Sequence, residues 1–188
     1  MNSLVFDIET VSNRHDEYKE AFPKSKKKAG LHAIISQVVA IGIQDGDDTW
    51  CPMAAGGSKE NELLEAFAEY LNKHKKNSTI VGFNIKNFDI PFLQMRAMLY
   101  GINLDFPDRR SPRIVDIYEV LGGKWQTDIS ACSLSELSWF LYGKGKATNG
   151  NEIQGMWDAG NTEGIRQHCL EDVEITNRIY QDFKGVYW

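Results

Sequence analysis

The chain has 188 residues, of which 42% are hydrophobic and 25% charged, and its formal net charge at pH 7 is −5. This composition is ordinary for a soluble globular protein and excludes wholesale disorder, and no apolar run approaches the roughly 20 residues of a membrane-spanning helix. A general nucleic-acid coat protein would be basic, so any contact with nucleic acid is expected to be local rather than spread over a face.

The cysteines and the N-terminal residues point to no special class of protein. Cys51, Cys132 and Cys169 are widely spaced and form no CxxC pair, so neither a zinc site nor a disulfide framework is expected. Residues 1–7 lack the basic and long apolar regions of a signal peptide, which leads us to expect a cytoplasmic protein without a membrane partner. Residues 1–188 show no repeat and no linker, and are expected to form a single domain.

Short apolar segments predict the strands. Residues 11–36 are instead polar and lysine-rich, and predict a long loop with a short helix. A turn signal, Asp45 to Asp48, separates two of the strands, which are expected to pair as a hairpin. The predicted strands cover residues 3–8, 37–44, 49–52, 78–83 and 113–115.

Capping residues and apolar residues at helical spacing predict the helices. Ser58 and Ser133 are expected to cap two of them, the second with Glu136 in a capping box, and Gly101 is expected to end another. Residues 142–151 predict a flexible basic loop. Because the strands come first as a meander and then alternate with helices, the order predicts an α/β fold with a mixed sheet flanked by helices. The predicted helices cover residues 58–74, Asp89–Tyr100, 116–121, 133–141 and 161 or 162 to 183.

Three acidic motifs carry the chemistry. Asp7 and Glu9 are predicted to end the first strand with both carboxylates on one face, where they repel unless a divalent cation lies between them. Alone, this pair also fits a solvated strand edge. Asp89 follows a buried strand, where α/β sheets place their ligands, although an aspartate there also suits a helix cap. His168 and Asp172 share one face of the last helix, as an exposed ion pair would.

In this order the motifs resemble those of the DEDD superfamily of 3′–5′ exonucleases, which has an RNase H-like fold. The resemblance is closest to predicted 3′–5′ exonucleases related to the proofreading domain of family B DNA polymerases. It covers nearly the whole chain and is sharpest in the last third, in residues 133–141, 143–146, 155–160 and 165–169.

The resemblance implies hydrolysis of phosphodiester bonds with two divalent cations, Mg²⁺ or Mn²⁺. In this scheme Asp7 bridges both ions, Glu9 and Asp172 complete the site that binds the attacking water, and Asp89 holds the second ion largely through water.

His168 departs from the family pattern. That family usually carries Tyr four residues before the last Asp, whereas the histidine branch of the superfamily places its His five residues before. An imidazole that titrates near about pH 6.5 can accept a proton from water, whereas a tyrosine with a pKa of about 10 would orient it. His168 is therefore expected to act as the base or to position the water.

Substrate contacts are expected around the same motifs. Phe88 could stack on a terminal base, Ile8 could act as a wedge beside it, and Thr10, Asn84 and Asn87 could contact sugar or phosphate. The lysine segments 24–28 and 144–146 are expected either to contact backbone phosphates or to be solvated loops. Three other aromatic residues are expected to be core residues: Phe92, Trp139 and Trp157.

The leading hypothesis is a 3′–5′ exonuclease on single-stranded DNA that releases nucleoside monophosphates. Activity on RNA or short oligonucleotides is the nearest alternative, since the carboxylates do not read the 2′-OH. A silent nucleic-acid-binding module and a nucleotidyl-transfer enzyme are further alternatives, against which the intact carboxylates and the His-xxx-Asp helix respectively argue. With no polymerase domain in the sequence, proofreading is expected only in trans, beside a polymerase or repair partner.

Overall fold

The computed structural model describes residues 2–24, 30–55, 59–74, 78–120, 132–147 and 150–187. A mixed sheet of five strands in the order β3-β2-β1-β4-β5 forms its centre. β1 pairs antiparallel with β2 and parallel with β4, so the predicted combination of an antiparallel meander with parallel strands is confirmed. The strands are β1 (Asn2–Ser12), β2 (Ser36–Asp45), β3 (Asp48–Trp50), β4 (Ser78–Gly82) and β5 (Ile114–Asp116).

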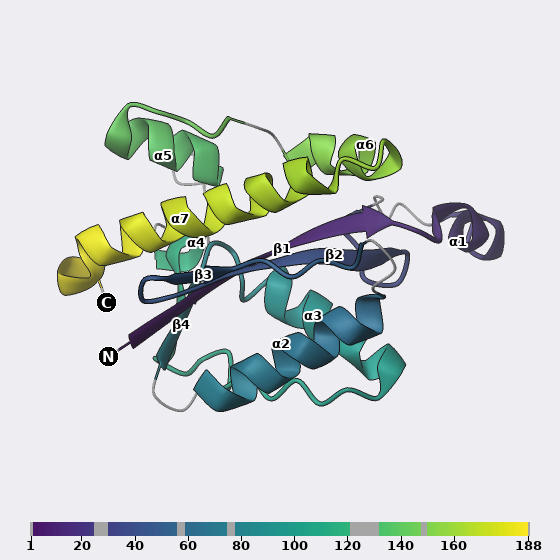
Figure 1. Ribbon diagram of the computed structural model, residues 1–188, viewed down its shortest axis with the longest axis horizontal. Coiled ribbons are helices and arrows are strands. Elements are labelled where there is room, and N and C mark those ends of the chain that lie inside the picture. Colours follow the sequence, from purple (N-terminus) through teal and green to yellow (C-terminus); the bar gives the residue numbers. More distant parts are fainter. Residues whose placement is uncertain are drawn as a thin grey trace.

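Helices cover both faces of the sheet (Figure 1). Helices α2 and α3 pack on one face, and the long α7 crosses the other face with α5 and α6 beside it. No helix in the described part of the chain is both long and apolar enough to cross a membrane. The helices are α1 (His15–Ala21), α2 (Glu60–His74), α3 (Asp89–Tyr100), α4 (Ile117–Val120), α5 (Leu134–Tyr142), α6 (Ile153–Asp158) and α7 (Thr162–Tyr187), with a 3₁₀ helix at Gly150–Glu152.

Strand β1 alternates between the two faces. Leu4, Phe6 and Ile8 pack into the core beneath α2 and α3, whereas Val5 and Val11 pack against elements on the α7 side. Because side chains alternate along a strand, Asp7 and Glu9 lie in the α7 row between those two valines. The prediction that charge ends this strand after residue 8 is wrong: β2 pairs with β1 as far as Ser12, and α6 and α7 cover the continuation.

The β1–β2 ladder is irregular beside the acidic pair. Glu9 faces Ala40 and Thr10 faces Val38, which leaves Val39 as an extra residue on β2. Such a bulge bends the strand and re-aims the neighbouring side chains. The irregularity thus falls at Glu9, one of the predicted metal ligands.

Several predicted helix ends are confirmed. Ser133 and Glu136 form the expected capping box, with Ser133 N donating to Glu136 Oε2 at 2.7 Å. Gly101 ends α3 in the left-handed conformation that favours glycine. The Ser58 cap lies outside the described residues. The predicted loop 142–151 is shorter than expected, because α5 reaches Tyr142 and the 3₁₀ helix and the unpredicted α6 follow from Gly150.

A buried ion pair joins the helices of the α2–α3 layer to the sheet. Arg96 Nε donates to Glu60 Oε1 at 2.9 Å, and the backbone N–H of Val38 donates to the same oxygen at 2.7 Å. Arg96 also donates to the carbonyl of Ala33 at 2.9 Å, so neither charge is left without a partner. This network holds α2, α3 and β2 together on the face opposite α7.

Gly42 sets how closely α7 approaches the sheet. It lies on β2 directly opposite Asp7, and its N–H points to Cys169 Sγ of α7 at 3.1 Å. A Cβ atom at this position would lie 2.9 Å from both Cys169 Sγ and Val173 Cγ2, and 3.1 Å from the Cys169 carbonyl oxygen. Any larger residue must therefore push α7 away from β1 and β2.

Replacing Gly42 with alanine is expected to lower the free energy of unfolding by about 1–3 kcal/mol, the usual cost of overpacking a core. Urea unfolding followed by circular dichroism measures this loss. Gly155→Ala is the matched control, because a Cβ atom at Gly155 meets nothing within 4 Å. An unchanged stability of the Gly42→Ala variant would show that α7 is not closely packed at this point.

Candidate active site

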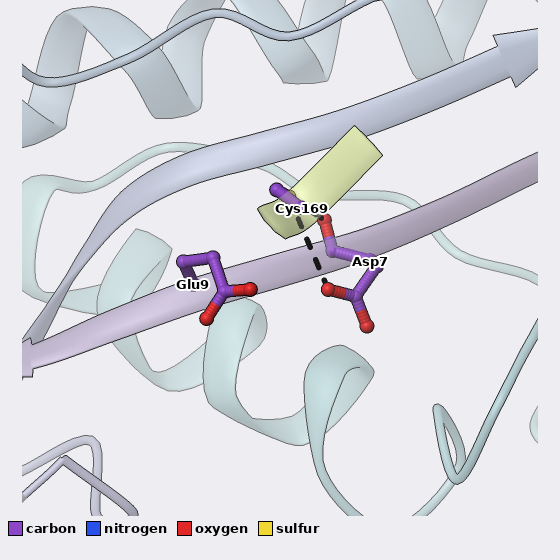
Figure 2. Close-up of side chains that lie close together, drawn as sticks. All are labelled: Asp7, Glu9 and Cys169. Carbon is purple, nitrogen blue, oxygen red and sulfur yellow. Dashed lines mark hydrogen bonds between the residues drawn. The ribbon is translucent and has the colours of Figure 1, made fainter. Parts of the chain in front are cut away.

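The predicted catalytic residues of β1 and α7 come together where α7 crosses the sheet. Asp7 and Glu9 project from β1, and Cys169 of α7 lies beside them (Figure 2). Cys169 Sγ is 3.5 Å from the Asp7 carbonyl oxygen and 3.9 Å from Asp7 Oδ2. The helical spacing of His168 and Asp172 then places both side chains over the same acidic pair.

Glu9 and His168 form a buried pair. His168 Nδ1 lies 2.5 Å from Glu9 Oε1, and the two residues are 3% and 7% exposed. Burial alone would lower the pKa of His168, but the hydrogen bond and the negative charge of Glu9 outweigh burial and raise it. His168 Nε2 is buried and has no hydrogen-bond partner among the described residues. The imidazole therefore has one nitrogen engaged by Glu9 and the other without a partner among the described residues.

Asp172 is paired with a lysine from a distant loop. The ammonium group of Lys146 contacts both carboxylate oxygens of Asp172, at 2.5 Å from Oδ2. Both side chains are largely buried. Burial raises the pKa of Asp172 and is the largest influence on it, while the positive charge of Lys146 acts in the opposite direction. Lys146 is thus a cation placed directly against one of the predicted metal ligands.

Asp89 lies next to β1 and is held by a backbone hydrogen bond rather than by a charged side chain. Its Oδ1 accepts a hydrogen bond of 3.1 Å from the backbone N–H of Ile8. The ladder between β1 and β4 has ended at Val5, so Asp89 takes over a strand N–H that β4 no longer reaches. Burial raises the pKa of Asp89 to about 8, although its backbone hydrogen bonds act against this rise.

The electrostatics of Asp7 reflect all these carboxylates. Its pKa is raised well above the usual value, first by burial and then by the charges of Asp172, Asp89 and Glu9. Lys146 only partly offsets this repulsion. The site therefore has a deficit of positive charge when all its carboxylates are ionised.

The donor set fits a hard divalent cation. Ligand atoms of Glu9, His168 and Asp172 lie within 4.8 Å of one another, as do those of Asp7, Glu9 and Cys169. Carboxylate oxygens are the ligands that Mg²⁺ and Mn²⁺ prefer, and the ammonium of Lys146 marks a place where positive charge is accommodated. Asp89 is not within either group, and its oxygen is directed to the N–H of Ile8.

Two adjoining cavities open beside these groups. The first, of about 430 Å³, is lined by Ile8, Glu9, Thr10 and Phe88 among others. The second, of about 690 Å³, is lined by Asp7, Asp172, Lys146 and the first residues of α5. Both cavities share Leu31 and Gly150 as lining residues, so together they form one cleft past the carboxylates.

The structure places the predicted substrate residues in two groups. Ile8, Thr10 and Phe88 line the first cavity beside Glu9. Asn84 and Asn87 instead hydrogen-bond each other at 3.1 Å and line neither cavity of the cleft. Asn84 has a φ of 62°, a left-handed conformation that asparagine tolerates better than most residues, so it has a structural reason to be there.

The aromatic predictions are partly wrong. Phe92 is 4% exposed and belongs to the core, as expected. Trp157 is partly buried against a core cluster that includes residues of α6 and α7. Trp139, however, is 65% exposed, because it lies on the outer side of α5 while Leu134 and Leu137 fill the buried side. Of the lysine segment 24–28, all but Lys24 lies outside the described residues.

Sequence reasoning missed three contributors to the site. Gly42 carries no local signal, because its importance depends on the register of β2 against β1 and on the position of α7. The pairing of Lys146 with Asp172 joins residues 26 positions apart and also leaves no local pattern. Asp116 could have been found as an acidic residue at the end of a strand, where it accepts hydrogen bonds from the N–H groups of Asn84 and Lys86.

Comparison with known proteins adds an independent line of observation. A family model described as "Predicted 3'-5' exonuclease related to the exonuclease domain of PolB" matches residues 27–186. A DNA polymerase of Thermococcus litoralis is 24% identical over 207 residues, which cover 96% of this chain and 11% of that protein. A DNA polymerase of Pyrococcus glycovorans is 22% identical over a stretch covering 96% of this chain and 24% of that protein.

A solved structure shares the fold. The family B DNA polymerase from the hyperthermophilic archaeon Pyrobaculum calidifontis superimposes with a TM-score of 0.69 at 19% sequence identity. The alignment covers 97% of this chain and 24% of that polymerase. The chain therefore spans only a quarter or less of the length of these relatives.

The raised pKa values predict an unusual pH dependence for the metal-free protein. Asp7, Asp89, Asp172 and His168 hold protons in the folded state that the unfolded chain has already lost, so stability falls as pH rises. The fall should extend from about pH 4, where unfolded aspartate titrates, to about pH 8, the folded-state pKa of Asp89. Among the described residues that titrate in acid with a resolved shift, only the exposed Glu136 shifts in the opposite direction.

Thermal unfolding in EDTA between about pH 5 and pH 8 measures this effect, and Tm is expected to fall by several degrees. Asp89→Asn, which cannot ionise, should flatten the profile. A Tm that rises over this interval would contradict the charge deficit described for the site.

Proposed function

The chain belongs to the family of predicted 3′-5′ exonucleases related to the exonuclease domain of PolB, and on this basis we propose that it is an active, metal-dependent 3′–5′ exonuclease. The expected resemblance is confirmed, including the link to family B polymerases. We further propose that the substrate is the 3′ end of single-stranded DNA and that nucleoside monophosphates are released.

The observation that carries this proposal is the convergence of Asp7 and Glu9 of β1 with Asp172 of α7. These residues are more than 160 positions apart at the extremes of the chain, yet their side chains meet at the wall of one cleft. A binding module without turnover would have no need to bury repelling carboxylates, since burial raises their pKa values and costs stability. That cost favours a catalytic role.

Asp7, Glu9 and Asp172 are the proposed ligands of two divalent cations, Mg²⁺ or Mn²⁺, with Asp89 contributing from beneath the strand. When bound, such ions stabilise the attacking and leaving oxygens of an in-line displacement at phosphorus. Water adds to the phosphorus atom, and the bond from phosphorus to the 3′-oxygen of the preceding nucleotide breaks. The terminal nucleotide then leaves as a monophosphate.

The remaining residues of the site bind, orient or move protons. His168 has Nδ1 on Glu9 and a buried Nε2 without a partner among the described residues, and its proposed role is to hold or accept a proton of the attacking water. Lys146 could move from Asp172 to a phosphate oxygen once another cation takes its place. The cavity beside Ile8, Thr10 and Phe88 would receive the terminal nucleotide.

The substrate contacts leave DNA and RNA as close alternatives, because none of the four carboxylates reads the 2′-OH. The relatives are DNA polymerases, and this favours DNA. The chain covers a quarter or less of those relatives, and we propose that it acts beside a polymerase or repair partner.

The central test is degradation of 5′-labelled single-stranded DNA and RNA with Mg²⁺, Mn²⁺ or EDTA. We expect a ladder that shortens from the 3′ end, faster on DNA, and no product in EDTA. Asp7→Asn should lower turnover at least about a thousandfold, because it removes a carboxylate that holds the proposed divalent cations. Asp47→Asn, in an exposed turn, is the control. Products in EDTA, or full activity of Asp7→Asn, would refute the proposal.

His168 is tested separately. His168→Ala should lower kcat by about a hundredfold or more, the usual contribution of a general acid or base, while Mn²⁺ affinity measured by calorimetry stays largely intact. His168→Tyr, which restores the residue usual in the family, should recover part of the turnover. An unchanged kcat in the alanine variant would remove His168 from the mechanism.

A further inference from the structure

Helix α5 exposes an indole ring beside the cleft. Trp139 is 65% exposed. A single exposed apolar side chain is common on protein surfaces and needs no explanation by itself. The relevance of Trp139 lies in its place on a helix whose first residues line the cleft.

One face of α5 connects the cleft to Trp139. Ser135 lines the cavity that also contains Asp7 and Asp172. Trp139 follows four residues later, so it lies on the same helical face, about 6 Å further along the axis. The helical face that begins at the carboxylates therefore continues to the exposed indole.

The loop that carries Lys146 runs along the same face. Ser135 Oγ accepts a hydrogen bond from Lys146 N at 3.0 Å, and Ser138 Oγ donates to the carbonyl of Lys144 at 2.7 Å. Between these contacts, a Cβ atom at Gly145 would lie 4.0 Å from Trp139 Cβ. The indole is thus adjacent to the segment whose lysine reaches Asp172.

We propose that Trp139 is a stacking platform for single-stranded nucleic acid on the 5′ side of the cleaved bond. This inference rests on the proposed exonuclease activity and extends it to the path of the substrate. The terminal nucleotide occupies the cavity beside Ile8 and Phe88, and the strand leaves through the adjoining cavity toward α5. A base two or more nucleotides upstream then stacks on Trp139.

The local charges favour stacking over electrostatic attraction as the source of affinity here. Lys144 is exposed on the loop, but Glu136 on α5 and Glu171, which accepts the N–H of Ala147 at 3.0 Å, place negative charge nearby. Aromatic stacking does not depend on this balance, and it is tolerant of base identity. An acidic protein can bind a strand locally in this way.

Phe140 supplies a matched control. It is 75% exposed and adjacent in sequence, but it projects about 100° away around the helix and does not share the face of Ser135. Trp139→Leu and Phe140→Leu both remove an exposed aromatic ring and keep a good helix former. Thermal unfolding should show that both variants remain folded.

The experiment compares kcat/KM for a long oligothymidylate with that for a thymidine dinucleotide, which on this path is too short to reach Trp139. Trp139→Leu should reduce the ratio of these two values on the order of tenfold through a higher KM for the long substrate, and Phe140→Leu should keep the wild-type ratio. Binding of labelled oligothymidylate in EDTA, followed by fluorescence anisotropy, should weaken similarly for Trp139→Leu alone.

The outcomes separate the two proposals. If the wild-type protein shortens DNA and Trp139→Leu keeps both the ratio and the affinity, the stacking platform is refuted and the exonuclease stands. An equal loss in both leucine variants would also refute it, because it would indicate nonspecific apolar contact. If the wild-type protein neither binds nor shortens either substrate, both proposals fail.

Discussion

Mutual repulsion among buried carboxylates is the constraint on which the rest of this site depends. Asp7 on β1 is surrounded by Glu9, Asp89 and Asp172, and the pKa values of all three aspartates are raised, first by burial and then by neighbouring carboxylate charges. Only a few kcal/mol separate a folded domain from an unfolded one, so such repulsion needs opposing positive charge. Lys146 and the imidazole of His168 supply part of it, and divalent cations would supply the rest.

The fold creates this arrangement through ordinary packing. Side chains alternate along β1, so one row packs into the core beneath α2 and α3. The other row contains the two acidic residues between Val5 and Val11. Gly42 then lets α7 lie directly on this row, so that His168 and Asp172 meet Glu9 and Asp7. The same packing leaves a cleft whose two cavities run past the carboxylates toward α5.

The sequence predicted those parts of the structure that have a local cause. The apolar strand that carries Asp7 and Glu9, the Ser133–Glu136 capping box and the Gly101 terminus all follow from neighbouring residues, and the structure agrees with them. Three other features arise from contacts between distant segments, which no local pattern encodes. They are the extension of β1 beyond its charged residues, the close packing at Gly42 and the pairing of Lys146 with Asp172. Residue type alone predicts Trp139 in the core, and its position on the outer face of α5 overrides that preference.

Anomalous diffraction from crystals soaked in Mn²⁺ locates bound ions without reference to activity. We expect manganese peaks among the oxygens of Asp7, Glu9 and Asp172, with the Lys146 ammonium displaced from Asp172. Crystals in which Lys146 stays on Asp172, and in which no peak lies among these carboxylates at saturating Mn²⁺, would contradict this expectation.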